Sequence, residues 1–235
     1  MNTPLTIDVL SDVVCPWCLI GKRRLELALA EYAQRFPQRP APVVRWHPFQ
    51  LNPDMPEEGM SRVDYVRQKF GDRADSIYDR VKAVGQSLDI PFAIDSIARQ
   101  PNTAAAHSLI GLAEEGEPQQ RLVEALFSAY FLKGVDLTQR QELERLALEA
   151  GLAPDDVNAC LDSEEARQHV RASDERARQM GVQGVPFFIF NNQVGVSGAH
   201  EPETLLQAME QALQDRKSTR LNSSHTDISR MPSSA

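Results

Sequence analysis

The stretch LTIDVLSDVVCPWC, residues 5–18, decides the fold of this chain. Apolar and polar residues alternate over residues 5–9, which predicts a β-strand. After the motif, apolar residues recur at helical spacing on one stripe, and Pro16 occupies the first helical position, where proline is favoured. The stretch therefore predicts a strand that turns into a helix, with Cys15 at the helix N-terminus and Cys18 one turn inside.

This placement predicts redox chemistry. The free N–H groups and the dipole of a helix N-terminus favour a thiolate over a thiol. A thiolate attacks a disulfide sulfur and forms a mixed disulfide, which a second thiol one turn away resolves. We therefore assign attack to Cys15, as the more exposed thiol, and resolution to Cys18, as the more buried one.

Two structural interpretations of the cysteine pair are weaker than the redox interpretation. A structural zinc site needs four ligands, but the only other cysteine is Cys160. The histidines are too scattered to complete a site, so we predict no metal centre. An inert structural disulfide is disfavoured because the N-terminus lacks the pattern of an export signal.

Composition narrows the class of protein further. The 235 residues are 42% hydrophobic and 25% charged, as in ordinary globular proteins. No apolar run approaches the roughly 18 residues of a membrane span. The net charge of −8 argues against nucleic acid or an anionic membrane as partner. We expect a cytoplasmic protein with a redox-active CxxC motif.

The rest of the chain has three predicted parts and a tail. A second strand is expected at residues 42–47, and residues 61–180 are nearly all helical in pattern. Residues 187–197 predict a hairpin through Asn191-Asn192, followed by a helix from Pro202. We therefore expect a split domain, residues 1–60 and 181–216, around a helical insertion at 61–180. Residues 217–235 lose the periodicity and are interpreted as a non-native or disordered tail.

This layout resembles a thioredoxin fold of the DsbA-like branch. Residues 11–21, 49–53, 101–103 with His107, and 184–188 resemble the FrnE-like oxidoreductases. The resemblance covers about residues 5–214. It implies an α/β, thioredoxin-like (DsbA-like) fold with a large all-helical insertion, and a thiol–disulfide oxidoreductase that acts through the CPWC dithiol.

The resemblance also implies further site residues. A cis Val185-Pro186 bond would face the CxxC motif, which makes Pro186 a third catalytic candidate beside the two cysteines. Trp17, Val185, Asn102 and His107 are the candidate substrate-binding residues. Three of them have simpler interpretations: Trp17 as cover for the helix start, Asn102 as a helix cap, and His107 as a structural histidine. The insertion is expected to roof the motif with the helix that begins at Asn102.

Two other functions stay open. Relatives of this family include 2-hydroxychromene-2-carboxylate isomerases and kappa-class glutathione transferases, which typically carry serine where Cys15 stands and use glutathione. The first alternative is thus a glutathione-dependent isomerase or transferase acting on a small aromatic or polyketide substrate, and the second is a non-enzymatic chaperone. We expect no tightly bound cofactor, glutathione as a candidate redox partner, and a disulfide-containing protein or small-molecule thiol as substrate. No role is assigned to Cys160 or to His200.

Overall fold

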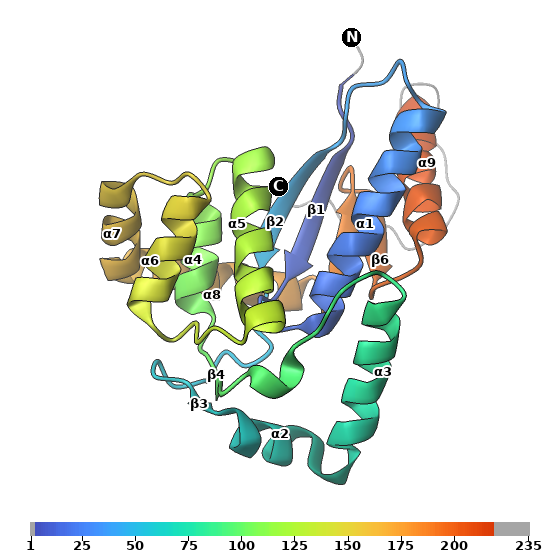
Figure 1. The fold of residues 1–235 in the computed structure, drawn as a ribbon. Coiled ribbons are helices and arrows are strands. Elements are labelled where there is room, and N and C mark those ends of the chain that lie inside the picture. Colours follow the sequence, from blue (N-terminus) through green and yellow to red (C-terminus); the bar gives the residue numbers. More distant parts are fainter. Residues whose placement is uncertain (1–2, 219–235) are drawn as a thin grey trace.

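A four-stranded sheet forms the centre of the computed structural model, which describes residues 3–218 (Figure 1). The strand order is β2 (Val43–Pro48), β1 (Thr6–Ser11), β5 (Phe187–Phe190) and β6 (Val194–Ser197). Strand β1 pairs in parallel with β2 and antiparallel with β5, which in turn forms a hairpin with β6. This is the expected thioredoxin-like arrangement with a helical insertion. Strands β1 and β5 are neighbours in the sheet, but the whole insertion lies between them in the sequence.

Helices cover both faces of the sheet. Helices α1 (Pro16–Arg35) and α9 (Pro202–Ser218) pack against each other over the face that carries Ile7 and Val9, both fully buried. On the opposite face, Leu10 packs with Phe49 and with Ala177 of α8 (Glu164–Gln179). The alternation of side chains along a strand explains this division, because neighbouring residues of β1 point to opposite faces.

The insertion contains a helical bundle and an arm. Helices α4 (Ala104–Leu112), α5 (Glu117–Phe127), α6 (Arg140–Glu149) and α7 (Pro154–Asp162) form the bundle beside β2, while α2 (Arg62–Phe70) and α3 (Ala74–Gln86) form the arm, which returns to contact α1 (Figure 1). Three short turns connect these helices: 3-10 turns at Gly71–Arg73 and Ile94–Ser96, and a π-helical turn at Ser128–Leu132.

The insertion shares its apolar core with the sheet. Trp46 of β2 makes an edge-on contact with Phe127 of α5, with ring centroids 6.4 Å apart. Lys22 of α1 is only 4% exposed, and its Nζ donates to the carboxylate of Glu124 in α5 at 2.6 Å. The helical part is therefore held against the thioredoxin-like part by both apolar packing and an ion pair.

Three details differ from the sequence-based expectation. A two-stranded sheet of β3 (Met60–Ser61) and β4 (Arg99–Gln100) was not predicted, because two residues are too few to show a strand pattern. Strand β2 runs from Val43 to Pro48, one residue beyond the expected end at residue 47. Helix α9 continues to Ser218, two residues into the predicted tail, and the remaining tail residues, 219–235, lie outside the described part of the chain. Within residues 3–218 no helix combines the length and the apolar character that crossing a bilayer requires.

Candidate active site

The CPWC motif lies at the N-terminus of α1, as predicted. Cys15 is the N-cap residue, with an extended backbone at φ −95° and ψ 112°, and Pro16 is the first helical residue. Both cysteines are free thiols. Cys15 is more exposed than Cys18, but only slightly, at 4% against 1%. The expected accessible thiol is thus largely covered by the surrounding chain.

The Val185-Pro186 segment is one of the elements that cover Cys15. The peptide bond between these residues is cis, as the resemblance implied. The Cys15 Sγ donates a weak hydrogen bond to the carbonyl oxygen of Val185, 3.6 Å away. The Pro186 ring packs on Gly21 of α1, where an added Cβ would lie 2.8 Å from the Pro186 Cγ. Only glycine at position 21 allows the proline ring to approach the helix this closely.

The electrostatic environment distinguishes the cysteines. Burial raises the pKa of the Cys18 thiol well above its ordinary value, and the neighbouring Cys15 raises it further, against smaller opposing effects of Ser11 and the Asp12 backbone. Burial also raises the pKa of Cys160, with Arg167 opposing. Both thiols therefore stay protonated near neutral pH, which makes them poor nucleophiles.

Two buried carboxylates hold the loop that follows β2 against the motif. Asp12 is fully buried, and its Oδ2 accepts a hydrogen bond from the Leu51 backbone at 2.8 Å. Asp174 of α8 is 4% exposed and accepts from the Gln50 backbone at 2.8 Å. Sequence analysis assigned no role to either aspartate, because their partners are 39 and 124 residues away.

Helix α4 brings His107 to this region, whereas Asn102 lies directly before the N-cap residue Thr103 and binds backbone groups. The His107 Nε2 lies 3.5 Å from the Asp12 Oδ1, and His107 is 3% exposed. The Asn102 Oδ1 accepts from the Ala104 backbone at 2.9 Å, and its Nδ2 donates to the Met55 carbonyl at 2.6 Å. These bonds match the structural interpretation of Asn102, which contacts neither thiol through them.

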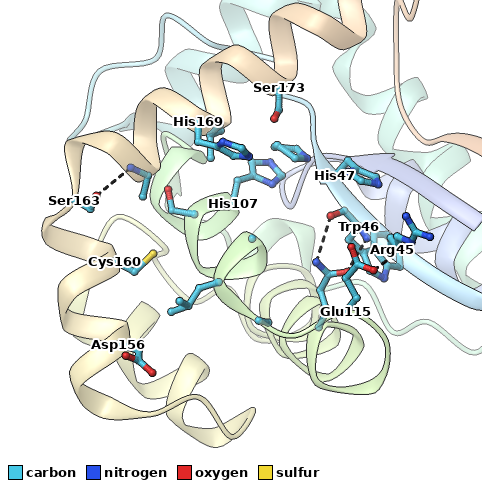
Figure 2. A pocket seen from close by; sticks show the side chains of 18 of the residues that line it. Arg45, Trp46, His47, His107, Glu115, Asp156, Cys160, Ser163, His169 and Ser173 are labelled. Carbon is cyan, nitrogen blue, oxygen red and sulfur yellow. Dashed lines mark hydrogen bonds and ion pairs between the residues drawn. The ribbon is translucent and has the colours of Figure 1, made fainter. Parts of the chain in front are cut away.

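A cavity of about 640 Å³ lies between β2, α4, α7 and α8. The side chains of His107 and His169 reach toward each other from α4 and α8, with His47 beyond them (Figure 2). The His47 Nε2 lies 2.8 Å from the Asp8 Oδ1. Cys160 also lines this cavity, but neither Cys15 nor Cys18 does. No group of three metal-ligating side chains lies within coordination reach anywhere in residues 3–218.

The arm contributes a residue that sequence analysis missed. Arg80 of α3 lies over the ring of Trp17, with 5.6 Å between the guanidinium carbon and the ring centroid. Trp17 is half-buried, so it is available both as cover for the helix start and as a contact surface. No pattern in the sequence distinguishes Arg80 from other arginines on amphipathic helices.

His200, to which no role was assigned, is exposed, and its backbone N–H donates to the Gly198 carbonyl.

Comparison with known proteins identifies the family. The family model of the DSBA-like thioredoxin domain matches residues 6–210. The chain belongs to this family. A probable DsbA oxidoreductase from Streptomyces coelicolor is 29% identical in sequence, with a TM-score of 0.78 over 95% of this chain and 94% of that one. The uncharacterized protein YwbO of Bacillus subtilis (strain 168) is 24% identical over 189 residues, which are 80% of this chain and 88% of YwbO.

Other DsbA-like structures share the fold at lower identity. A 2-hydroxychromene-2-carboxylate isomerase is 16% identical, with a TM-score of 0.65 over 93% of this chain and all of that one, 100%. The cytosolic disulfide reductase DsbM from Pseudomonas aeruginosa, solved with GSH, is 20% identical, with a TM-score of 0.55 over 92% and 100% of the two chains. These two structures share the thioredoxin-like fold of this chain.

Proposed function

We propose that this chain is a thiol–disulfide oxidoreductase that acts through Cys15 and Cys18. The observation that carries the proposal is the position of Cys15, which is the N-cap of α1 and lies 3.6 Å from the Val185 carbonyl oxygen. Membership of the DsbA-like family supports it at the level of the reaction class.

The proposed reaction has two thiol–disulfide exchanges. In the first, the Cys15 thiolate attacks a substrate disulfide, so that a Cys15–substrate S–S bond forms and one substrate thiolate leaves. In the second, Cys18 attacks Cys15, its proton passes to solvent, and the second substrate thiolate leaves. The dithiol loses two electrons and the substrate disulfide gains them. The reverse sequence oxidises a substrate dithiol.

Four neighbouring residues have supporting roles in this proposal. Pro186 packs beside the sulfurs and supplies no N–H group there. The backbone of Val185 pairs with an extended substrate chain. The half-buried ring of Trp17 contacts the substrate next to the thiols. His107 lies 3.5 Å from the Asp12 carboxylate, three residues before Cys15, and contributes to substrate binding from this position. Glutathione is the candidate redox partner, and the GSH found with DsbM supports it.

Trapping of the mixed disulfide tests the proposal. A Cys18→Ser variant should accumulate a covalent Cys15–substrate adduct with hydroxyethyl disulfide, visible as an added mass that dithiothreitol removes. A Cys15→Ser variant should form no such adduct and should lose disulfide exchange. A wild-type protein that exchanges no disulfide would refute the proposal.

The Cys15→Ser variant also separates the alternatives. Serine replaces the attacking thiol, so disulfide exchange ends, whereas a glutathione-dependent isomerisation would survive. Suppression of aggregation that persists after removal of both cysteines would instead favour the chaperone alternative.

A further inference from the structure

The arm places a positive charge over Trp17, which stands between the two cysteines of the motif. Trp17 lies within the CPWC motif, directly before Cys18, and Arg80 is stacked over its indole ring. A guanidinium over an aromatic face is attracted to the ring and loses part of its freedom to move. Arg80 is nevertheless exposed to solvent, so its N–H groups remain accessible to a bound molecule.

Arg80 has no counterion among the side chains that the structure describes. Within residues 3–214 it takes part in no ion pair, and the adjacent Asp79 is not within ion-pair distance of it. Arg178 is the contrasting case, because it stacks over Phe49 at 4.4 Å but also donates to the Asp174 carboxylate at 2.7 Å. The stacking of Arg178 is part of a neutralised structural contact, whereas the charge of Arg80 remains available to a partner.

We propose that Arg80 is a specificity-determining residue that selects disulfides carrying a carboxylate near their sulfur atoms. This inference rests on the proposed function, since it names the substrate class of the same thiols. A guanidinium binds a carboxylate through paired N–H donors. The protein as a whole has a net charge of −8, which repels anionic substrates. The uncompensated charge of Arg80 offsets that repulsion at the point of reaction.

The charge acts on the first exchange step. As Cys15 attacks, the new Cys15–sulfur bond forms and the substrate S–S bond breaks, so negative charge moves to the departing sulfur. That thiolate then takes a proton from solvent. Arg80 attracts the substrate carboxylate as the substrate approaches. It also stabilises the negative charge of the substrate while the mixed disulfide forms.

A charge series of small disulfides tests the inference. The rate of adduct formation is measured by mass spectrometry on the Cys18→Ser variant. The substrates are dithiodipropionate, hydroxyethyl disulfide and cystamine, which are similar in size and are anionic, neutral and cationic, respectively. Each rate is divided by the rate with free mercaptoethanol, which removes the intrinsic reactivity of the disulfide.

Adding Arg80→Gln should lower the normalised rate with dithiodipropionate about three- to tenfold and raise the rate with cystamine, because a single nearby charge changes association by this order. The rate with hydroxyethyl disulfide should change little, which also shows that the variant is folded. Arg80→Lys keeps the charge and should retain most of the preference. Added salt should reduce the preference of the wild-type arginine.

The matched control is Arg73→Gln. Arg73 is exposed and is the N-cap residue of α3, about two helical turns before Arg80. The Arg73→Gln substitution removes the same charge from the same arm. The ratio of the normalised rate with dithiodipropionate to that with cystamine should stay unchanged. If the ratio of the dithiodipropionate rate to the cystamine rate is the same with arginine and with glutamine at position 80, the inference is overturned but the proposed function remains intact. Failure of all three disulfides to react would refute the proposed function instead.

Discussion

The Nε2 of His107 lies 3.5 Å from the Oδ1 of Asp12, although 95 residues separate them and both side chains are almost fully buried. The second oxygen of Asp12 holds the backbone of Leu51, and Asp12 itself precedes Cys15 by three residues. The imidazole of His107 therefore brings the helical insertion into contact with the turn that precedes Cys15. His107 thus has a structural position in addition to its proposed place beside the substrate.

The first prediction separates these two roles of His107. His107→Ala should lower the free energy of unfolding by about 2–4 kcal/mol, because it leaves a void and removes a ring that lies against a buried carboxylate. Urea denaturation measures the change. His169→Ala, an exposed residue of the same cavity, is the control and should change stability by less than about 0.5 kcal/mol. Unchanged stability with a raised KM would assign His107 to substrate binding alone.

The second prediction concerns the three thiols. Cys15 should react with iodoacetamide faster than Cys18 or Cys160 near neutral pH, because burial raises the pKa of the other two. Peptide mapping of the reduced, partly labelled protein gives the three rates. In guanidinium the rates should become similar, which serves as the control. Equal rates in the folded protein would contradict the assignment of Cys15 as the nucleophile.

The third prediction uses the contact between Gly21 and Pro186. Gly21→Ala should destabilise the fold by about 1–3 kcal/mol, because its Cβ would lie 2.8 Å from the proline ring and 3.2 Å from Phe188. It should also slow disulfide exchange, since Pro186 directly follows Val185, whose carbonyl oxygen accepts the hydrogen bond from Cys15. Gly111→Ala is the matched control on α4, where nothing lies within 4 Å of the added carbon. It should raise stability by up to about 1 kcal/mol through helix propensity. Destabilisation of both variants alike would show that packing at Pro186 is not the cause.

The fourth prediction is a pH dependence that involves Glu124. Burial alone would raise the pKa of this carboxyl, but hydrogen bonds from Arg23 and Lys22 outweigh burial and lower it. A lowered pKa stabilises the fold above the ordinary carboxyl pKa, and this contribution disappears as the pH falls through the lower value of the folded state. Glu124→Gln should therefore reduce the free energy of unfolding at neutral pH by about 1 kcal/mol, after allowance for solvent screening.

Denaturant titrations at several pH values check this dependence. The difference between wild type and Glu124→Gln should shrink toward zero in acid. Glu57→Gln, at an exposed carboxylate outside any ion pair within residues 3–218, should show no such dependence. A constant difference across the whole range would mean that the pKa of Glu124 is not lowered in the folded state.

The local elements of the fold were predictable from sequence. The strand, the CPWC turn and the helix follow one another in the chain, so their pattern contains the necessary information. The hairpin turn at Asn191 and Asn192 was predictable for the same reason, and both residues adopt the positive φ values, 51° and 54°, that such turns require. The cis Pro186 followed only from the family resemblance, because a cis bond is rare at an arbitrary proline.

The contacts that shape the site were not predictable in this way. The bond from the Gln50 backbone to Asp174 joins residues 124 positions apart, and nothing in the local pattern of either segment indicates it. Arg80 lies on an ordinary amphipathic helix, and only the return of the arm to α1 brings it over Trp17. Such contacts depend on the tertiary packing of separate elements, which a single sequence does not specify locally.

The pairing of β1 has a consequence for biosynthesis. Its residue Val9 lies opposite Phe188, so the second edge of β1 stays open while the ribosome makes the entire insertion. The carbonyl of Val185 also reaches Cys15 only at this late stage. A nascent chain therefore carries its CPWC thiols without their final cover, and a thiol left uncovered in this way is exposed to oxidation by other disulfides. The segment that follows the insertion thus completes the environment of a motif made before it.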